Sequence, residues 1–159
     1  MIKFLISSLL ITSLYAQIIN LDTSLQVANQ TNKTVLIFLH KNGCGYCNAM
    51  EEFTLDDDEI KKFISLHFIY VSINISQNID IIFHKTRQSG LEFAKEIGYN
   101  FYPTILFLDR DGELLDATVG YKENTEFLQF LHYIRSSEND TLSFEEYKHQ
   151  TTDTIHAKR

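Results

Sequence analysis

Tryptophan is absent from this chain, proline occurs once and cysteine twice. Two cysteines allow at most one intramolecular disulfide, which excludes the multiply cross-linked scaffolds of small secreted domains. Basic side chains are also scarce, because 14 lysines and arginines face 21 acidic residues and the formal net charge at pH 7 is −7. Without a basic patch, we expect no binding of nucleic acid. Hydrophobic residues make up 44% of the 159 positions, enough to build the core of one domain.

The N-terminal segment, residues 1–16, has the pattern of a secretory signal peptide. Lys3 supplies a positive start, an apolar stretch extends to Leu14, and Ala16 is a small residue suited to cleavage. A transmembrane anchor is the alternative, but the apolar stretch is short for crossing a bilayer. We therefore expect cleavage after Ala16 and a mature protein that is periplasmic or otherwise exported.

The rest of the chain alternates between strand and helix patterns. Continuous apolar runs and turn signals predict strands at 34–40, 67–75, 104–108 and 113–119. Apolar spacing and capping residues predict helices at 21–30, 44–54, 59–66, 89–97 and 124–135. Asp22 or Thr23 is the expected cap of the first helix. This order requires a parallel crossover between the first two strands and an antiparallel pair at the end.

Two segments fit this alternation less well. Residues 76–88 show no clear period, and we interpret them as an irregular insertion. Residues 137–159 form a polar C-terminal tail, in which Phe144, Tyr147 and Leu142 are the side chains expected to dock a short helix onto the body. For about the last eight residues we expect a frayed tail.

Both cysteines lie in one motif, Cys44-Gly45-Tyr46-Cys47. A disulfide between them closes a very small loop, so it removes little chain entropy and is a poor structural staple. The spacing is typical of redox-active pairs and of zinc half-sites. Zinc needs about four ligands, and the six histidines form no spaced pair near the motif. The motif therefore favours a redox dithiol, with a staple and a zinc site as the weaker alternatives and with no cofactor expected.

The only proline, Pro103, stands in Phe101-Tyr102-Pro103-Thr104, just before an apolar run. Residues 32–136 resemble the thioredoxin superfamily. The resemblance rests on this proline segment, the apolar strand before Cys44, Cys-Gly-Tyr-Cys, the segment 91–98, the segment Thr-Ile-Leu-Phe-Leu-Asp-Arg-Asp-Gly and Gly120. The nearest likeness is to exported bacterial thioredoxins, including the SoxW type of sulfur-oxidation systems and the C-terminal domain of the transmembrane disulfide reductase DsbD. The resemblance implies an α/β thioredoxin fold over residues 17–136, with a central mixed sheet of about four to five strands flanked by helices.

The chemistry assigns a role to each residue of the motif. Cys44 at a helix N-terminus is the expected nucleophile, because backbone N–H groups and the helix dipole favour its thiolate. Cys47, one turn further on, is the expected resolving thiol. The resemblance implies a cis bond between Tyr102 and Pro103, in a loop that offers its backbone to an extended substrate peptide. Gly45 and Tyr46 are expected to contact the substrate as well, with a merely solvated aromatic as the alternative for Tyr46.

The chain also departs from typical cytosolic thioredoxins. Gly43 replaces the tryptophan before the first cysteine, and Phe38 replaces the buried aspartate of the preceding strand. The usual proton acceptor is therefore missing, and water or a nearby group must substitute for it. His40 and Lys41 are candidates for positive charge near Cys44, although residues in such loops are more often simply solvated. The pair between the cysteines resembles that of the periplasmic isomerase DsbC, but the dimerisation domain of that isomerase is missing, so we expect a monomer.

The sequence thus predicts an exported thiol–disulfide oxidoreductase, working as a disulfide reductase. The alternatives are a disulfide oxidase or isomerase, and a non-catalytic binding module with an inert disulfide. The expected partners are protein thiols and disulfides, together with a membrane electron donor of the DsbD type.

Overall fold

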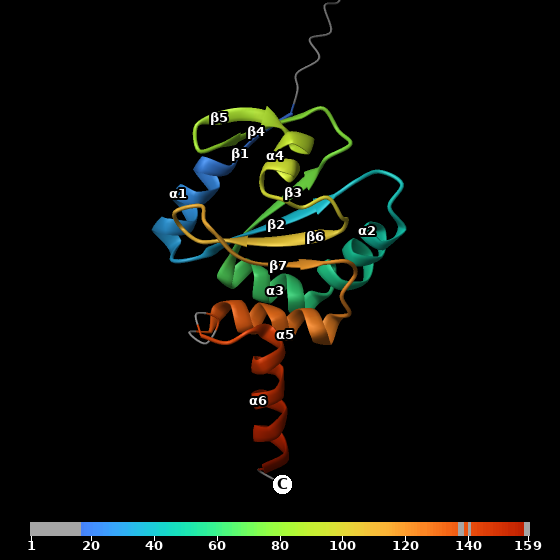
Figure 1. Ribbon diagram of the computed structural model, residues 1–159, viewed down its shortest axis with the longest axis vertical. Helices are drawn as coiled ribbons and strands as arrows, with labels where there is room; N and C mark the ends of the chain where they lie inside the picture. Colours follow the sequence, from blue (N-terminus) through green and yellow to red (C-terminus); the bar gives the residue numbers. More distant parts are fainter. Residues whose placement is uncertain (1–16, 137–138, 140, 158–159) are drawn as a thin grey trace, which may run out of the picture.

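The computed structural model describes residues 17–136, 139 and 141–157 (Figure 1). The predicted signal peptide, residues 1–16, lies outside the described residues. A mixed sheet of four strands forms the centre of the body, in the order β3 (Phe68–Asn74), β2 (Thr34–His40), β6 (Thr104–Leu108) and β7 (Leu114–Val119). β2 runs parallel to β3 and antiparallel to β6, and β6 runs antiparallel to β7. The predicted parallel crossover and final antiparallel pair are confirmed.

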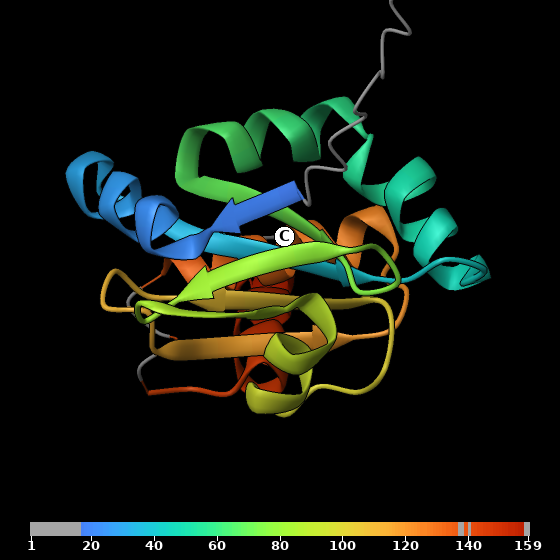
Figure 2. The ribbon, with the colours of Figure 1, turned by 90° about the horizontal axis from the view of Figure 1, so that it is seen from above.

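Helices cover both faces of this sheet (Figures 1 and 2). One face carries α1 (Leu21–Thr31) and α4 (Gly90–Glu96). The other face carries α2 (Gly45–Ala49), the π-helical turn η1 (Met50–Leu55), α3 (Asp58–His67) and α5 (Asn124–Arg135). All of these helices were predicted within a few residues. The helix predicted at 44–54 is divided, because its second half widens into η1; such π-turns occur often beside functional sites.

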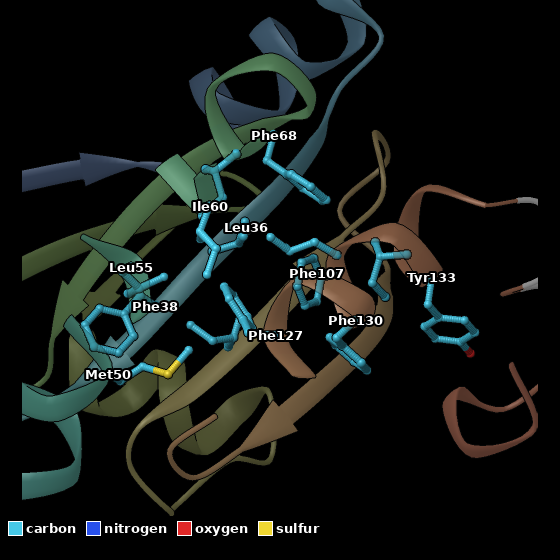
Figure 3. Close-up of a cluster of buried hydrophobic side chains, with 14 of the residues drawn as sticks. Leu36, Phe38, Met50, Leu55, Ile60, Phe68, Phe107, Phe127, Phe130 and Tyr133 are labelled. Carbon is cyan, nitrogen blue, oxygen red and sulfur yellow. The ribbon is translucent and has the colours of Figure 1, made fainter. Parts of the chain in front are cut away.

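Alternation along β2 explains why its apolar run is continuous. Leu36 and Phe38 face the cluster beneath α2, α3 and α5, while Val35, Ile37 and Leu39 face the cluster beneath α1 and α4. All five side chains are fully buried. A strand that is covered on both faces needs apolar residues at every position, without the usual polar alternation. Figure 3 shows the first of these clusters, which extends from Phe38 and Met50 to Phe130 and Tyr133.

The interpretation of residues 76–88 as an irregular insertion is wrong. They contain β4 (Ile79–Phe83) and the start of β5 (Thr86–Ser89), which pair as an antiparallel hairpin. β1 (Gln17–Asn20) adds to β4 in parallel, so that a second sheet forms in the order β1-β4-β5. Its apolar residues alternate inward from β4, where Ile79, Ile81 and Phe83 are buried.

The turn of this hairpin carries no glycine or asparagine, which is why the sequence did not reveal it. His84 and Lys85 both adopt positive φ, at 48° and 64°. Their backbone N–H groups donate to the two carboxylate oxygens of Asp22, each at 2.8 Å. Asp22 therefore holds the hairpin and does not cap α1. The cap is Asn20, whose side-chain oxygen accepts the N–H of Thr23 at 3.0 Å.

The C-terminal tail contains α6 (Phe144–Ala157), which is longer than the short docking helix that the sequence predicts and points away from α5 (Figure 1). The predicted docking of Phe144 and Tyr147 is confirmed. The ring of Phe144 lies 4.7 Å from that of Phe130, edge to face, and the ring of Tyr147 lies 5.4 Å from that of Tyr133. In the part of the chain that the structure describes, no helix has the length and apolar character needed to cross a membrane.

Candidate active site

The two cysteines lie where β2 leads into α2, and they are joined as a disulfide. Cys44 is the N-cap residue of α2 and has extended backbone angles, whereas Cys47 lies inside the first turn. The exposed fraction is 8% for Cys44 and 1% for Cys47. Of the two residues, Cys44 is therefore the more accessible.

Hydrogen-bond donors at the start of α2 are directed at Cys44. The backbone N–H of Cys47 donates to the Cys44 sulfur at 3.1 Å, and the N–H groups of Cys47 and Asn48 both lie 3.1 Å from the Cys44 carbonyl oxygen. Once the disulfide is reduced, the donor that points at sulfur favours the Cys44 thiolate, and so does the positive end of the helix dipole.

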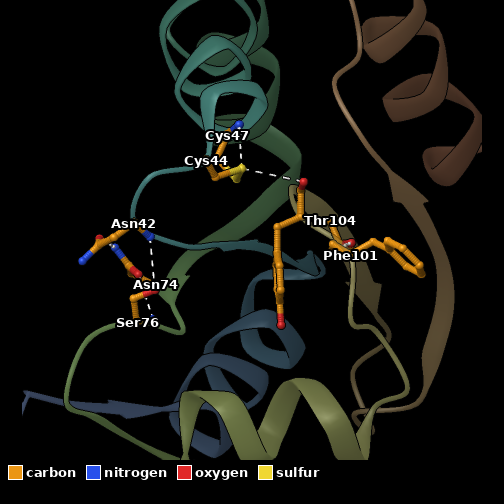
Figure 4. Close-up of a disulfide and its surroundings, with 8 residues drawn as sticks. Asn42, Cys44, Cys47, Asn74, Ser76, Phe101 and Thr104 are labelled. Carbon is orange, nitrogen blue, oxygen red and sulfur yellow. Dashed lines mark hydrogen bonds between the residues drawn. A yellow bond between two sulfur atoms is a disulfide. The ribbon is translucent and has the colours of Figure 1, made fainter.

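The loop before Cys44 is fixed by polar contacts to the end of β3 (Figure 4). The amide of Asn74 donates to the side-chain oxygen of Asn42 at 2.8 Å, and the backbone N–H of Asn42 donates to the Ser76 hydroxyl at 3.2 Å. Gly43 follows with φ of +69°, a left-handed conformation that favours glycine. A tryptophan at position 43 would be strained by this backbone conformation, although the space beside Gly43 is open.

The proline loop lies against the disulfide (Figure 4). The Tyr102–Pro103 peptide bond is cis, and the Tyr102 carbonyl oxygen lies 3.7 Å from the Cys44 sulfur. Two hydrogen bonds hold the loop: the Thr104 hydroxyl donates to the Phe101 carbonyl at 2.7 Å, and the Gly120 N–H donates to the Pro103 carbonyl at 2.8 Å. The structure therefore brings Tyr102 and Pro103 beside Cys44 although they are far away in sequence.

Two exposed aromatic side chains belong to the cysteine motif and to the proline loop. Tyr46 is 72% exposed and Phe101 is 75% exposed. Gly45 is also exposed and has open space beside it. Phe101 was not among the predicted site residues; its place directly before Tyr102-Pro103 is visible in the sequence, but its exposure is visible only in the structure.

The charges expected near Cys44 differ from the prediction. Burial lowers the pKa of His40, while the carboxylate of Glu51 acts in the opposite direction. His40 is therefore mainly neutral at neutral pH, and the idea that it supplies positive charge is wrong. The ammonium group of Lys41 lies 5.6 Å from the centre of the Tyr102 ring, where it links the cysteine loop to the proline loop. Burial raises the pKa of Tyr102, which keeps this phenol protonated.

Phe38 is completely buried in the cluster that also contains both cysteines. Its ring stacks on that of His40, with 4.7 Å between the centres and 4° between the planes. The position of the usual buried aspartate is thus filled by packed apolar surface. Among the described residues, no group of three or more His, Cys, Asp or Glu side chains is arranged to hold a metal ion.

Solved structures of several thioredoxin-fold proteins are similar to this chain. A thioredoxin-fold protein from Helicobacter pylori has 22% identity, covers 77% of this chain and 86% of its own, and gives a TM-score of 0.63. A thioredoxin from Thermus thermophilus has 21% identity, with 78% and 89% coverage and a TM-score of 0.60. The oxidised DsbD C-terminal domain of Neisseria meningitidis has 19% identity, with 70% and 86% coverage and a TM-score of 0.52.

These likenesses show the thioredoxin fold, which the sequence predicted. No curated protein matches the chain. The profile of the thioredoxin-like domain family matches residues 21–135, from the first residue of α1 to the last of α5. Since that match spans most of the sequence, the chain belongs to the thioredoxin-like domain family.

Proposed function

We propose that this protein is an exported thiol–disulfide oxidoreductase that reduces disulfides in other proteins, with Cys44 as the nucleophile and Cys47 as the resolving thiol. Thiol–disulfide oxidoreduction follows from the family and from the Cys44–Cys47 disulfide. The observation that carries the proposal is the position of this disulfide, at a helix N-terminus and against the Tyr102–Pro103 loop.

The proposed reaction begins with the reduced protein. The Cys44 thiolate attacks a substrate disulfide, forms a mixed disulfide and releases the first substrate thiolate. Cys47 then attacks the Cys44 sulfur, and the second substrate thiolate leaves. The protein dithiol is oxidised to the disulfide seen in this structure, and the substrate disulfide is reduced to two thiols. The different exposures of the two sulfur atoms favour this order of attack.

The surroundings of Cys44 suit an extended peptide as substrate. The proline loop lies at the sulfur and is rigidly held by Thr104 and Gly120, so the Tyr102 backbone is available at a fixed place for strand-like pairing. Tyr46 and Phe101 add exposed aromatic surface on which apolar side chains of a partner can pack.

Export is supported by the signal-peptide pattern of residues 1–16. A membrane protein of the DsbD type is the electron donor that we propose; the likeness to a DsbD C-terminal domain is consistent with protein thiols as partners. The resemblance to exported thioredoxins favours the direction of reduction over that of oxidation.

Insulin reduction tests the proposal, with the Cys44–Cys47 reduction potential measured in parallel. We expect catalysed reduction that disappears in Cys44→Ser, and a potential closer to the ~−270 mV of thioredoxin than to the ~−120 mV of DsbA. Refolding of reduced substrates without insulin reduction would instead show an oxidase. Failure of both reactions would show a binding module.

A further inference from the structure

Resolution of the mixed disulfide requires Cys47 to lose its thiol proton. The usual acceptor in thioredoxins is a buried aspartate, and Phe38 occupies that position here. Cys47 is 1% exposed, so bulk water has little access to it. Phe38, which packs in the same cluster, has no ionisable group. A buried thiol without an acceptor would stay protonated, because burial disfavours the thiolate. Another group near this cluster is needed.

His40 lies beside this cluster. It follows Phe38 by two residues on β2, so both side chains are on the sheet face that α2 and η1 cover, and their rings stack. The half-buried imidazole is fixed on its other side, because Nε2 lies 3.0 Å from the hydroxyl oxygen of Ser72. Ser72 pairs with Phe38 in the register of β2 and β3. The imidazole is thus oriented by one stacking contact and one hydrogen bond.

The helix that carries Cys47 faces the same place. Glu51 follows Cys47 by one helical turn, so the two residues share a face of the segment formed by α2 and η1. The exposed Glu51 carboxylate acts electrostatically on His40 from that helix. From β3, the neighbouring titratable group is Tyr70, whose phenol interacts with Ser72 and whose pKa is raised to about 12 by burial. Lys41, next in the chain, is directed to the Tyr102 ring.

We infer that His40, held by Ser72, takes the proton of the Cys47 thiol through a water molecule and so replaces the missing carboxylate. With Nε2–H donated to Ser72, Nδ1 holds the lone pair that accepts the proton. The Cys47 thiolate then attacks the Cys44 sulfur and forms the Cys44–Cys47 disulfide. The bond between Cys44 and the substrate sulfur breaks, and its electron pair leaves with the substrate as a thiolate. The imidazolium returns its proton to solvent. The lowered pKa of His40 suits this role, because the ring is neutral and able to accept at neutral pH.

This inference rests on the proposed function, and single-turnover reduction of dithiobis(nitrobenzoate) by excess reduced protein separates the two. The first thionitrobenzoate is released at a rate proportional to protein concentration as Cys44 attacks. The second is released at a concentration-independent rate as Cys47 resolves the adduct. Failure of the unaltered protein to release either product would refute both the function and the inference.

His40→Gln retains an amide donor for Ser72, and His40→Phe retains the ring on Phe38. In both variants we expect the second phase to slow on the order of 10²-fold at neutral pH, the lower end of general-base contributions, with the first phase unchanged. The second-phase rate of the unaltered protein should rise through an imidazole titration below pH 6.5 and then level off. In the variants the second-phase rate should keep rising to pH ~8.5, where a free thiol ionises, and beyond it, because burial disfavours the Cys47 thiolate.

The matched control is His67→Phe, which makes the same change on α3, where the ring packs against Phe63. It should leave both phases unaltered. Second-phase rates within twofold of the unaltered protein in both His40 variants, with the same pH profile, would overturn the inference. A second phase that is slowed by Glu51→Gln but by neither His40 variant would also overturn the inference. The Glu51 carboxylate would then be the group that accepts the proton. Should His40→Phe fail to fold, His40→Gln alone decides.

Discussion

Replacement of Phe38 by alanine tests whether the base of the active site is packed apolar core. Phe38 is 0% exposed and contacts both the cluster beneath the cysteines and the His40 ring. Removing a buried phenylalanine side chain typically costs about 3–5 kcal/mol, since burial is lost and a cavity remains. Small domains have only about 5–15 kcal/mol of stability, so the variant should remain folded with a much reduced margin. Its matched control is Phe53→Ala on η1, where the ring is 58% exposed and the expected change is within ~0.5 kcal/mol.

Urea denaturation of the oxidised proteins, followed by far-ultraviolet circular dichroism because tryptophan is absent, measures both variants. A loss below ~1 kcal/mol for Phe38→Ala, against the ~3–5 kcal/mol expected for core phenylalanine, would refute the packing argument. An equal loss in the two variants would refute it as well.

Phe38→Asp adds a test of polarity at the same place. Burial without a charged partner raises the pKa of a carboxyl group above its value in the unfolded chain. The folded state then binds more protons than the unfolded state, so the stability of Phe38→Asp relative to Phe38→Ala should fall as pH rises above ~3.9. Equal stability of these two variants at neutral pH would show that the site is already polar or open to water.

Three further predictions concern the expected signal peptide, a helix cap and two glycines. Mass spectrometry of protein from the native host should find an N-terminus at or within a few residues of Gln17; an intact, membrane-bound chain would contradict this. Ser89 and Glu92 form a capping box at the start of α4, and Ser89 holds the pKa of Glu92 below its usual value. Ser89→Ala should therefore lower the free energy of unfolding by ~1 kcal/mol in urea denaturation and raise the pKa of Glu92 in a nuclear magnetic resonance titration. An unchanged pKa of Glu92 would argue against the capping box. Gly43→Ala should destabilise the protein by ~1–2 kcal/mol, because residue 43 has positive φ. Gly45→Ala should be neutral or stabilising by up to ~1 kcal/mol, because Gly45 lies in α2 with open space beside it. If both substitutions destabilised the protein equally, the backbone argument would be refuted.

Most of the four-stranded sheet could be predicted from local sequence patterns. β2 and β6 have the predicted bounds because long apolar runs end in recognisable turn signals, and α5 was predicted from the apolar spacing that includes Phe127 and Leu131. The β4–β5 hairpin could not be predicted, because its turn depends on His84 and Lys85 at positive φ and on a carboxylate from α1.

The candidate active site could likewise be predicted only in part from the sequence. The Cys-x-x-Cys motif and the proline loop are visible in the sequence because each is a short contiguous pattern. The environment of His40 is not visible, because Ser72 comes from another strand and Glu51 from η1. Whether a histidine is charged or neutral depends on such distant neighbours, so the sequence could name His40 only as a candidate for positive charge, with a solvated loop residue as the alternative.

Trapping of mixed disulfides with Cys47→Ala and Cys44→Ala tests the central claim most directly. Each variant is reduced, exposed to glutathione disulfide and to disulfide-bonded protein substrates near neutral pH, quenched with acid and mapped by peptide mass spectrometry. We expect Cys47→Ala to accumulate adducts on Cys44, because attack occurs but resolution cannot. Cys44→Ala should accumulate few, because the Cys47 sulfur is almost completely buried. Equal trapping by the two variants, or faster trapping on Cys47, would contradict the assignment of nucleophile and resolving thiol.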